Sequence, residues 1–132
     1  MSLNEPYSIL LIDGNDTRKK QTSSRLRMQN FVVETAQGGF HCVHMVEKQK
    51  FDLLIIQGDE LEDMPAEEVT LLVRNIHTKA ELPILAILSE EDDEEASGLI
   101  QSGVNEVVIN TGNFNLILKE IEKIQKSTPK KK

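Results

Sequence analysis

Five short, mostly apolar runs, each followed by a segment with helical spacing, constrain what this chain can fold into. The runs are rich in leucine, isoleucine and valine, and they lie at residues 7–12, 31–35, 51–57, 82–88 and 106–110. Strands that are apolar throughout, rather than alternating, are typical of a parallel sheet with both faces buried. The alternation of strand and helix therefore predicts a doubly wound α/β domain with a five-stranded parallel sheet.

The segments between the runs have the apolar spacing of helices. Residues 17–29 are compatible with a helix but weakly patterned, and Gly103 is expected to end the fourth helix. The apolar positions expected to define the helices are Leu26 and Met28; Phe40, Val43 and Val46; Val69, Leu72, Val73 and Ile76; Ala96, Leu99 and Ile100; and Phe114, Ile117, Leu118, Ile121 and Ile124.

Composition fits one ordinary globular domain. The chain has 132 residues, of which 39% are hydrophobic and 28% charged, so it can bury a core without disulfides or a metal. The single cysteine, Cys42, cannot form an internal disulfide, which favours a reducing compartment. We find no apolar run near the roughly 20 residues of a membrane span, and the N-terminal residues do not resemble a signal peptide. We therefore expect a cytoplasmic domain with no membrane contact.

Charge is distributed unevenly along the chain. The formal net charge is −7, but four lysines (126, 130, 131 and 132) lie at the C-terminus, and without them residues 1–125 carry 11 basic and 22 acidic groups, a net charge of −11. We expect residues 1–125 to form the domain and residues 126–132 a basic tail or linker stub. A body this acidic is unsuited to binding phosphate backbones, so no nucleic-acid contact is expected. Basic residues gather in 17–33 and acidic ones in 90–95.

Over roughly residues 8–125 the order of motifs resembles a bacterial response-regulator receiver domain. The motifs are ILLIDGND (9–16), A-x-x-G (36–39), FDLLIIQ (51–57), LPILAIL (82–88) and G-x-x-x-V-V-x-N (103–110). The resemblance implies a flavodoxin-like topology with strand order 2-1-3-4-5, numbered along the chain. With right-handed crossovers, the first and last helices then cover one face and the middle three the other.

The resemblance also implies where a phosphorylation site would lie. Receivers place two acidic residues after the first strand, a phosphoacceptor aspartate at the end of the third, a hydroxyl after the fourth and a lysine after the fifth. The corresponding positions here are Asp13 and Gly14, Gln57, Leu88 (with Ser89 one residue later), and Asn110 followed by Thr111. Only Asp13 keeps the chemistry of its position, so the chain resembles a degenerate member, a pseudo-receiver. We expect no enzyme activity, no cofactor and no bound metal.

These substitutions predict a phosphorylation-independent module that acts by protein–protein interaction in signalling or localisation. In active receivers a hydroxyl and an aromatic residue move together, and the positions here are Leu88 and Val107. The expected partner is another signalling or localisation protein or a C-terminal output domain, and a homodimer is possible. The candidate contact residues are Ser97, Gln101, Val108, Lys119, Glu122 and Lys123, with a second, basic face at Arg18, Lys19, Arg25 and Arg27.

Two alternatives remain open at this stage. Asp59, two residues after Gln57, could be a displaced phosphoacceptor, with Asp16 as the missing metal ligand. Alternatively, the former acidic pocket could bind a small ligand, because fewer charges there make a neutral or anionic guest more tolerable.

Residues 41–44 contain possible metal ligands, but their spacing does not favour a metal site. His41 and His44 lie three residues apart, but Cys42 points about 100° away from His41 on a helix, and no fourth ligand is evident. Surface histidines and a buried or half-buried thiol are the better interpretation.

Overall fold

The computed structural model describes residues 6–59, 61–110 and 112–127, in which strands and helices alternate strictly. The strands are β1 (Ser8–Ile12), β2 (Val32–Ala36), β3 (Leu53–Gln57), β4 (Ile84–Leu88) and β5 (Glu106–Ile109). The helices are α1 (Asp16–Met28), α2 (Gly39–Lys48), α3 (Ala66–Arg74), α4 (Asp93–Ser102) and α5 (Phe114–Ser127). Each strand predicted from an apolar run is present, within two residues of its predicted ends.

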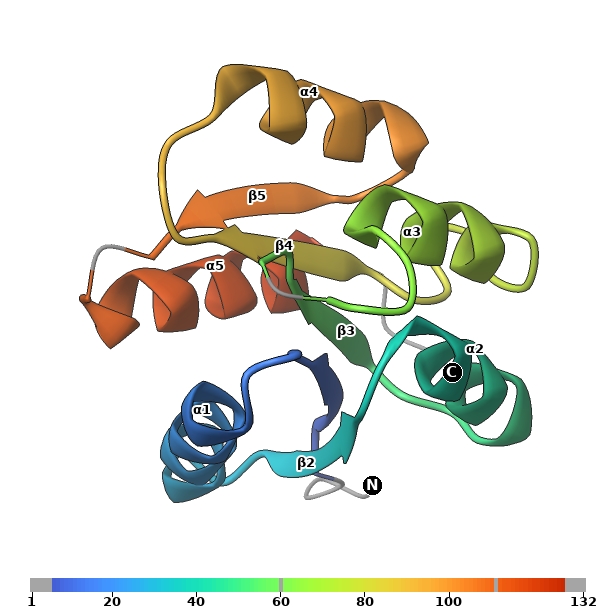
Figure 1. Ribbon diagram of the computed structural model, residues 1–132. Coiled ribbons are helices and arrows are strands. Elements are labelled where there is room, and N and C mark those ends of the chain that lie inside the picture. The colour runs from blue at the N-terminus through green and yellow to red at the C-terminus, as the bar shows by residue number, and fades with distance from the viewer. Residues whose placement is uncertain (1–5, 60, 111, 128–132) are drawn as a thin grey trace.

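The strands form one parallel sheet in the order β2-β1-β3-β4-β5, which confirms the predicted topology (Figure 1). β3 and β4 are buried along their whole length, whereas the edge strands β2 and β5 are partly exposed. This burial explains why the central runs are apolar at every position, since both of their faces meet helices.

Two apolar cores lie on opposite faces of the sheet, as expected. On one face α1 and α5 pack through Leu26, Ile117, Ile121 and Ile124 against side chains such as Ile9 and Ile55. On the other face α2, α3 and α4 pack through Cys42, Val46, Val69, Val73 and Leu99 against side chains such as Leu10, Leu54 and Ala86. Figure 1 shows the two helices on one side of the sheet and the three on the other.

Three of the apolar side chains used to predict the helices are exposed. Phe40 is 68% exposed, Met28 78% and Ile100 44%. In α2 the buried residues are Gly39, Cys42 and Val46, because the helix packs closely against the β3–α3 segment. A Cβ at Gly39 would lie 2.5 Å from the Met64 side chain and 2.9 Å from that of Val69, so this close packing favours glycine.

The helix ends near the carboxyl edge of the sheet are fixed by side-chain caps. Asn15 caps α1 by accepting the Arg18 N–H at 2.9 Å, and Asp92 caps α4 by accepting the Glu95 N–H at 3.0 Å. Gly103, with a φ of 122°, ends α4 as predicted. These caps hold the first turns of α1 and α4 against the loops that follow β1 and β4.

α5 continues through Lys126 and Ser127, which begin the predicted tail, and Lys126 lies 3.6 Å from Glu122. The rest of that tail lies outside the described residues. Among the helices that are described, none is both long enough and apolar enough to cross a bilayer.

Candidate functional site

The carboxyl ends of the strands bring the predicted site positions to one edge of the sheet. Ile12 of β1 pairs with Ile56 of β3, so the next residue of each strand, Asp13 and Gln57, lies at the same edge of the sheet. Gln57 in turn pairs with Ile87, and Leu88 pairs with Ile109. In open parallel sheets this edge is where sites are built, and the placement expected from the sequence is therefore reproduced.

Asp13 is 1% exposed and forms a two-point ion pair with Arg18. The Arg18 Nε donates to Oδ2 at 2.8 Å and Nη2 donates to Oδ1 at 2.7 Å. The backbone N–H of Asn15 also donates to Oδ1, at 2.8 Å. Both carboxylate oxygens therefore already accept hydrogen bonds, and a guanidinium of the same chain balances the buried charge.

The ion pair was not predicted, and Arg18 was assigned to a basic outer face. The structure corrects this, because Arg18 lies in the first turn of α1 and turns back toward the end of β1. Its side chain is only 23% exposed. The sequence does contain a pattern that could have indicated this ion pair. An arginine lies in the first turn of a helix, five residues after a buried aspartate, with an N-cap asparagine between them.

A second cluster joins the ends of β3 and β4. Oδ2 of Asp59 accepts hydrogen bonds from Nε2 of Gln57 at 2.7 Å, from Oγ of Ser89 at 2.7 Å and from the Ser89 N–H at 3.0 Å. Gln57 is 3% exposed, so its amide is held inside this network. The β4–α4 loop is thus tied to the β3–α3 loop through one carboxylate oxygen.

The remaining predicted positions offer little chemistry. Leu88 is 1% exposed and belongs to the core beneath α4. Asn110 makes local contacts: its N–H donates to the Leu88 carbonyl at 2.8 Å and its Oδ1 accepts the Gly112 N–H at 3.0 Å. Gly14 is exposed and has no side chain to offer. Thr111 lies outside the described residues.

Comparison with known proteins identifies the fold. No family model matches the sequence, but solved structures superpose closely. A two-component response regulator from Clostridium difficile covers 94% of the chain and 99% of its own length at a TM-score of 0.85 and 18% identity. The chemotaxis response regulator CheY4 of Vibrio cholerae covers 91% and 99% at 0.82 and 22% identity. The chain has the receiver fold.

Two further matches come from longer proteins. The CAI-1 autoinducer sensor kinase/phosphatase CqsS of Vibrio cholerae is 24% identical over 114 residues, which is 86% of this chain but only 16% of that protein. A probable two-component response regulator/GGDEF domain protein superposes on 96% of this chain with a TM-score of 0.87 and 16% identity, and the match covers 52% of its length. In both, the matching part is a fraction of a larger chain.

The receiver fold implies a Mg²⁺ site at this edge, and the residues present do not fit one. Mg²⁺ demands near-ideal octahedral oxygen ligation, usually with carboxylates. Here both oxygens of Asp13 accept hydrogen bonds, Gly14 supplies no ligand and Gln57 donates its amide N–H to Asp59. Within the described ranges no group of three or more histidine, cysteine, aspartate or glutamate side chains is placed to hold a metal ion.

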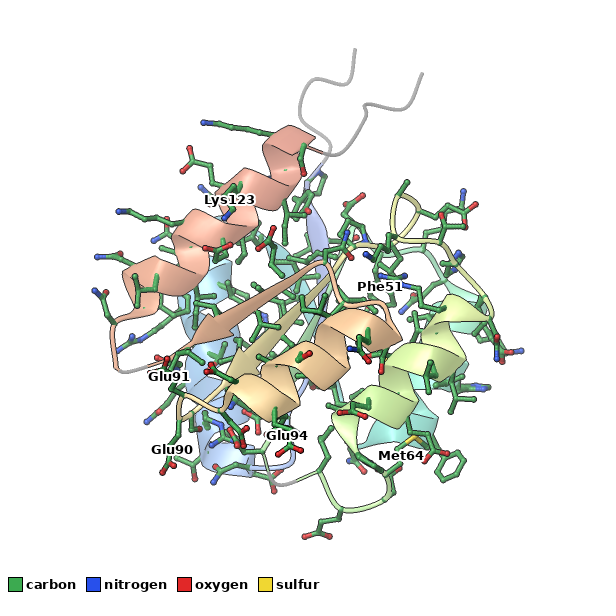
Figure 2. All side chains as sticks on the ribbon, turned by 90° about the horizontal axis from the view of Figure 1, so that it is seen from above. Phe51, Met64, Glu90, Glu91, Glu94 and Lys123 are labelled. Carbon is green, nitrogen blue, oxygen red and sulfur yellow. The ribbon has the colours of Figure 1, made fainter. Side chains whose placement is uncertain are left out.

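Negative charge surrounds the start of α4 in this receiver fold. Burial, followed by the charges of Asp59, Asp92 and Glu67, raises the pKa of Glu95 above its ordinary value. Figure 2 shows that Glu90, Glu91 and Glu94 gather where β4 leads into α4. The predicted acidic segment is therefore an exposed patch beside the strand-end site.

The first candidate interaction face is mostly accessible. Ser97 and Gln101 on α4, and Lys119, Glu122 and Lys123 on α5, are exposed. Lys123 lies 3.3 Å from Glu120 and 3.9 Å from Glu106. Val108 was wrongly placed on this face: it is 9% exposed and packs in the core beneath α5, because alternate residues of β5 point to opposite faces of the sheet.

The second, basic face is smaller than the sequence indicates. Besides Arg18, Lys19 is drawn inward, with a side chain 13% exposed and 3.4 Å from Asp16. Arg27 is exposed, but its guanidinium donates to the Val33 carbonyl at 2.8 Å. Arg25 stays exposed with its guanidinium 5.4 Å from the Phe114 ring.

Arg25 and Phe114 border a shallow groove of about 440 Å³ between the end of α1 and the start of α5. Its other lining residues are Met28, Gln29, Gly112, Asn113 and Asn115. None of the five positions of the predicted phosphorylation site lines this groove.

The histidine and cysteine side chains of α2 do not converge. Cys42 is fully buried, and burial together with the charge of Asp63 raises the pKa of its thiol to about 12. His41 is exposed and its Nδ1 accepts the Gln37 N–H at 3.1 Å, while His44 is exposed. The prediction of a buried thiol between surface histidines is confirmed.

Proposed function

We propose that this domain is a pseudo-receiver, a module that works in bacterial two-component signalling or localisation by binding proteins without being phosphorylated. The observation that carries the proposal is the strand-end site itself. Its buried carboxylate, Asp13, is paired with Arg18, and the phosphoacceptor position holds the neutral Gln57 within a hydrogen-bond network.

The chemistry of phosphoryl transfer to aspartate supports this proposal. The reaction needs a carboxylate oxygen free to attack phosphorus and a cation to neutralise charge on the phosphoryl oxygens. An amide at Gln57 has no anionic oxygen, and Asn110 brings no positive charge where receivers have lysine. The guanidinium of Arg18 is already paired with the Asp13 carboxylate.

The absence of a ligand-driven switch leads to constitutive binding. The position of the mobile hydroxyl is Leu88, packed in the core, and the position of the mobile aromatic residue is Val107. A shift between two conformations requires a ligand that binds them with different affinity. We therefore propose that Ser97, Gln101, Lys119, Glu122 and Lys123 present a permanent docking surface in a cytoplasmic protein.

The relatives support a signalling partner or an attached domain. One is named a sensor kinase/phosphatase and another a response regulator/GGDEF domain protein, and in each the matching part belongs to a longer chain. The partner we propose is accordingly another signalling protein, or an output domain joined to this one.

Incubation with acetyl phosphate and Mg²⁺, followed by intact-mass measurement, tests the first half of the proposal. We expect the mass of the wild-type protein to stay unchanged. Addition of one phosphoryl group would contradict a pseudo-receiver. A receiver domain with its acceptor aspartate intact, treated in parallel, shows that the donor is competent.

One observation favours a second candidate, an active receiver with Asp59 as the acceptor. Asp59 lies in direct contact with a hydroxyl, since Ser89 Oγ is 2.7 Å from its Oδ2. The same assay separates the two functions. If the wild-type protein gains a phosphoryl group and Asp59→Asn does not, Asp59 is the acceptor.

Surface variants test the binding half. Lys119→Glu/Lys123→Glu reverses charge on the α5 side of the proposed surface, and Lys20→Glu/Arg25→Glu is the matched change on α1, where these residues are exposed. Partners captured by the wild-type protein from its native lysate should be lost with the first variant and retained with the second. The reverse result would move the docking surface to α1.

A further inference from the structure

The buried carboxylate of Asp13, at the end of β1, needs a positive charge to balance it, since the residue is only 1% exposed. In the receiver fold that charge is expected from a divalent cation, whereas here it comes from Arg18 of the same chain. We propose that Arg18 is a built-in countercation that neutralises Asp13 in place of a divalent cation and excludes such an ion from the site.

The geometry explains the exclusion. Nε and Nη2 of Arg18 approach one carboxylate oxygen each, at 2.8 and 2.7 Å, so the planar guanidinium spans both oxygens. A metal ion would have to displace this two-point contact, and until it did the two positive charges would repel each other.

The backbone of Arg18 is also held in place independently of this ion pair. Its backbone N–H donates to the Asn15 side chain, which caps α1, and its own side chain is only 23% exposed. The cap fixes the helical turn from which the side chain starts, so the guanidinium needs only its own torsions to be ordered to reach Asp13. A diffusing ion competes with a partner that is already in position.

A specific consequence follows for restoring the site. Replacing Gly14 with aspartate would recreate the acidic pair of receivers, and Gly14 is exposed at the end of β1. Arg18 would still cover Asp13 in that variant. The inference goes beyond the proposed function, because it holds whether or not the domain binds a protein partner.

Four proteins test the exclusion: the wild type, Gly14→Asp, Arg18→Ala and Gly14→Asp/Arg18→Ala. Binding of Mn²⁺ is measured by loss of the free-ion EPR signal, and the thermal midpoint is measured with Mg²⁺ and with EDTA. We expect the double variant to bind Mn²⁺ and to gain roughly 3 °C or more with Mg²⁺. The wild type and Gly14→Asp should respond to neither ion.

Every outcome decides the matter. Binding by Gly14→Asp that equals that of the double variant would show that Arg18 excludes nothing. A folded double variant that binds no Mn²⁺ would show that Arg18 does not stand where a cation could bind. Far-UV circular dichroism checks folding, and if the alanine variants are unfolded, Gly14→Asp/Arg18→Gln takes their place. Gly14→Asp/Arg25→Ala removes an exposed arginine from the same helix instead and should bind no more Mn²⁺ than Gly14→Asp.

Discussion

Removal of Arg18 should destabilise the protein at least as much as removal of both members of its ion pair, because the single change leaves a buried carboxylate unpaired. Arg18→Met takes away two charge-assisted hydrogen bonds and leaves the Asp13 carboxylate with the Asn15 N–H. Breaking a buried pair costs about 3–5 kcal/mol. Because the Arg18 side chain is 23% exposed, water can partly replace it, and we expect about 3 kcal/mol, the lower end of that range.

The double-mutant cycle with Asp13→Asn isolates the coupling. Asp13→Asn should cost about 1–2 kcal/mol, since Arg18 reaches solvent and its charge can be hydrated. Asp13→Asn/Arg18→Met should be less damaging than the sum of the single changes by about 2 kcal/mol. Urea is the proper denaturant, because guanidinium ions could themselves pair with the carboxylate that the substitution leaves without Arg18.

The control is Lys20→Met, which removes an exposed basic side chain from the same helix and should change the free energy of unfolding by no more than about 0.5 kcal/mol. If the two single changes at Asp13 and Arg18 simply add, within about 0.5 kcal/mol, the two side chains are not coupled. The assignment of Arg18 as the partner of a buried charge would then be wrong.

Four other changes probe the rest of the molecule. Arg74→Met should cost about 2–3 kcal/mol in urea unfolding, because its guanidinium donates to three backbone carbonyls and one side-chain amide. Asp63→Ala should cost about 1 kcal/mol at pH 7 in the same urea assay. Hydrogen bonds from the Gly39 and Phe40 N–H groups lower the pKa of Asp63. The stabilisation is therefore present above the ordinary aspartate pKa and is lost as pH falls through the lowered pKa of the folded protein. Glu95→Gln should stabilise the protein at pH 7 and not at pH 4 in parallel urea titrations, since a raised pKa makes the folded state lose stability as pH rises. The Cys42 thiol should react with a disulfide reagent only at the rate of unfolding, as its burial and raised pKa require.

The fold was predictable because it depends on patterns repeated along the chain. Each buried strand has an apolar run, and the end of α4 has a glycine whose positive φ few other residues adopt. In α5 the spacing of Ile117, Ile121 and Ile124 leaves one consistent buried stripe. Such signals involve residues near one another in sequence.

The wrong predictions concern α2 and β5, in which the pattern of apolar residues allows either of two faces to be buried. α2 is ten residues long and has apolar residues on several sides, so the sequence could not decide between Phe40 and Cys42 as the buried position. β5 has Val107 and Val108 side by side, and only the packing of the two sheet faces shows which of them meets α5.

The sequence predicted where the site residues lie in the fold, but it did not predict which side chains contact one another there. The strand ends fixed where Asp13 and Gln57 lie, but the Arg18 side chain reaches back across a turn and Ser89 meets Asp59 from a different loop. Those contacts depend on side-chain reach and loop conformation, which neither composition nor periodicity encodes.

Amide NMR spectra recorded with Mg²⁺, first alone and then with beryllofluoride, test the central claim most directly. Beryllofluoride forms a stable phosphoryl-like adduct with an acceptor aspartate, so it reports both the site and the conformational response. We predict that the amide signals of Ser89, α4 and β5 show no saturable shift, because Gln57 has no anionic oxygen to form the adduct and both oxygens of Asp13 are bound by Arg18. Saturable shifts of those signals would contradict the account.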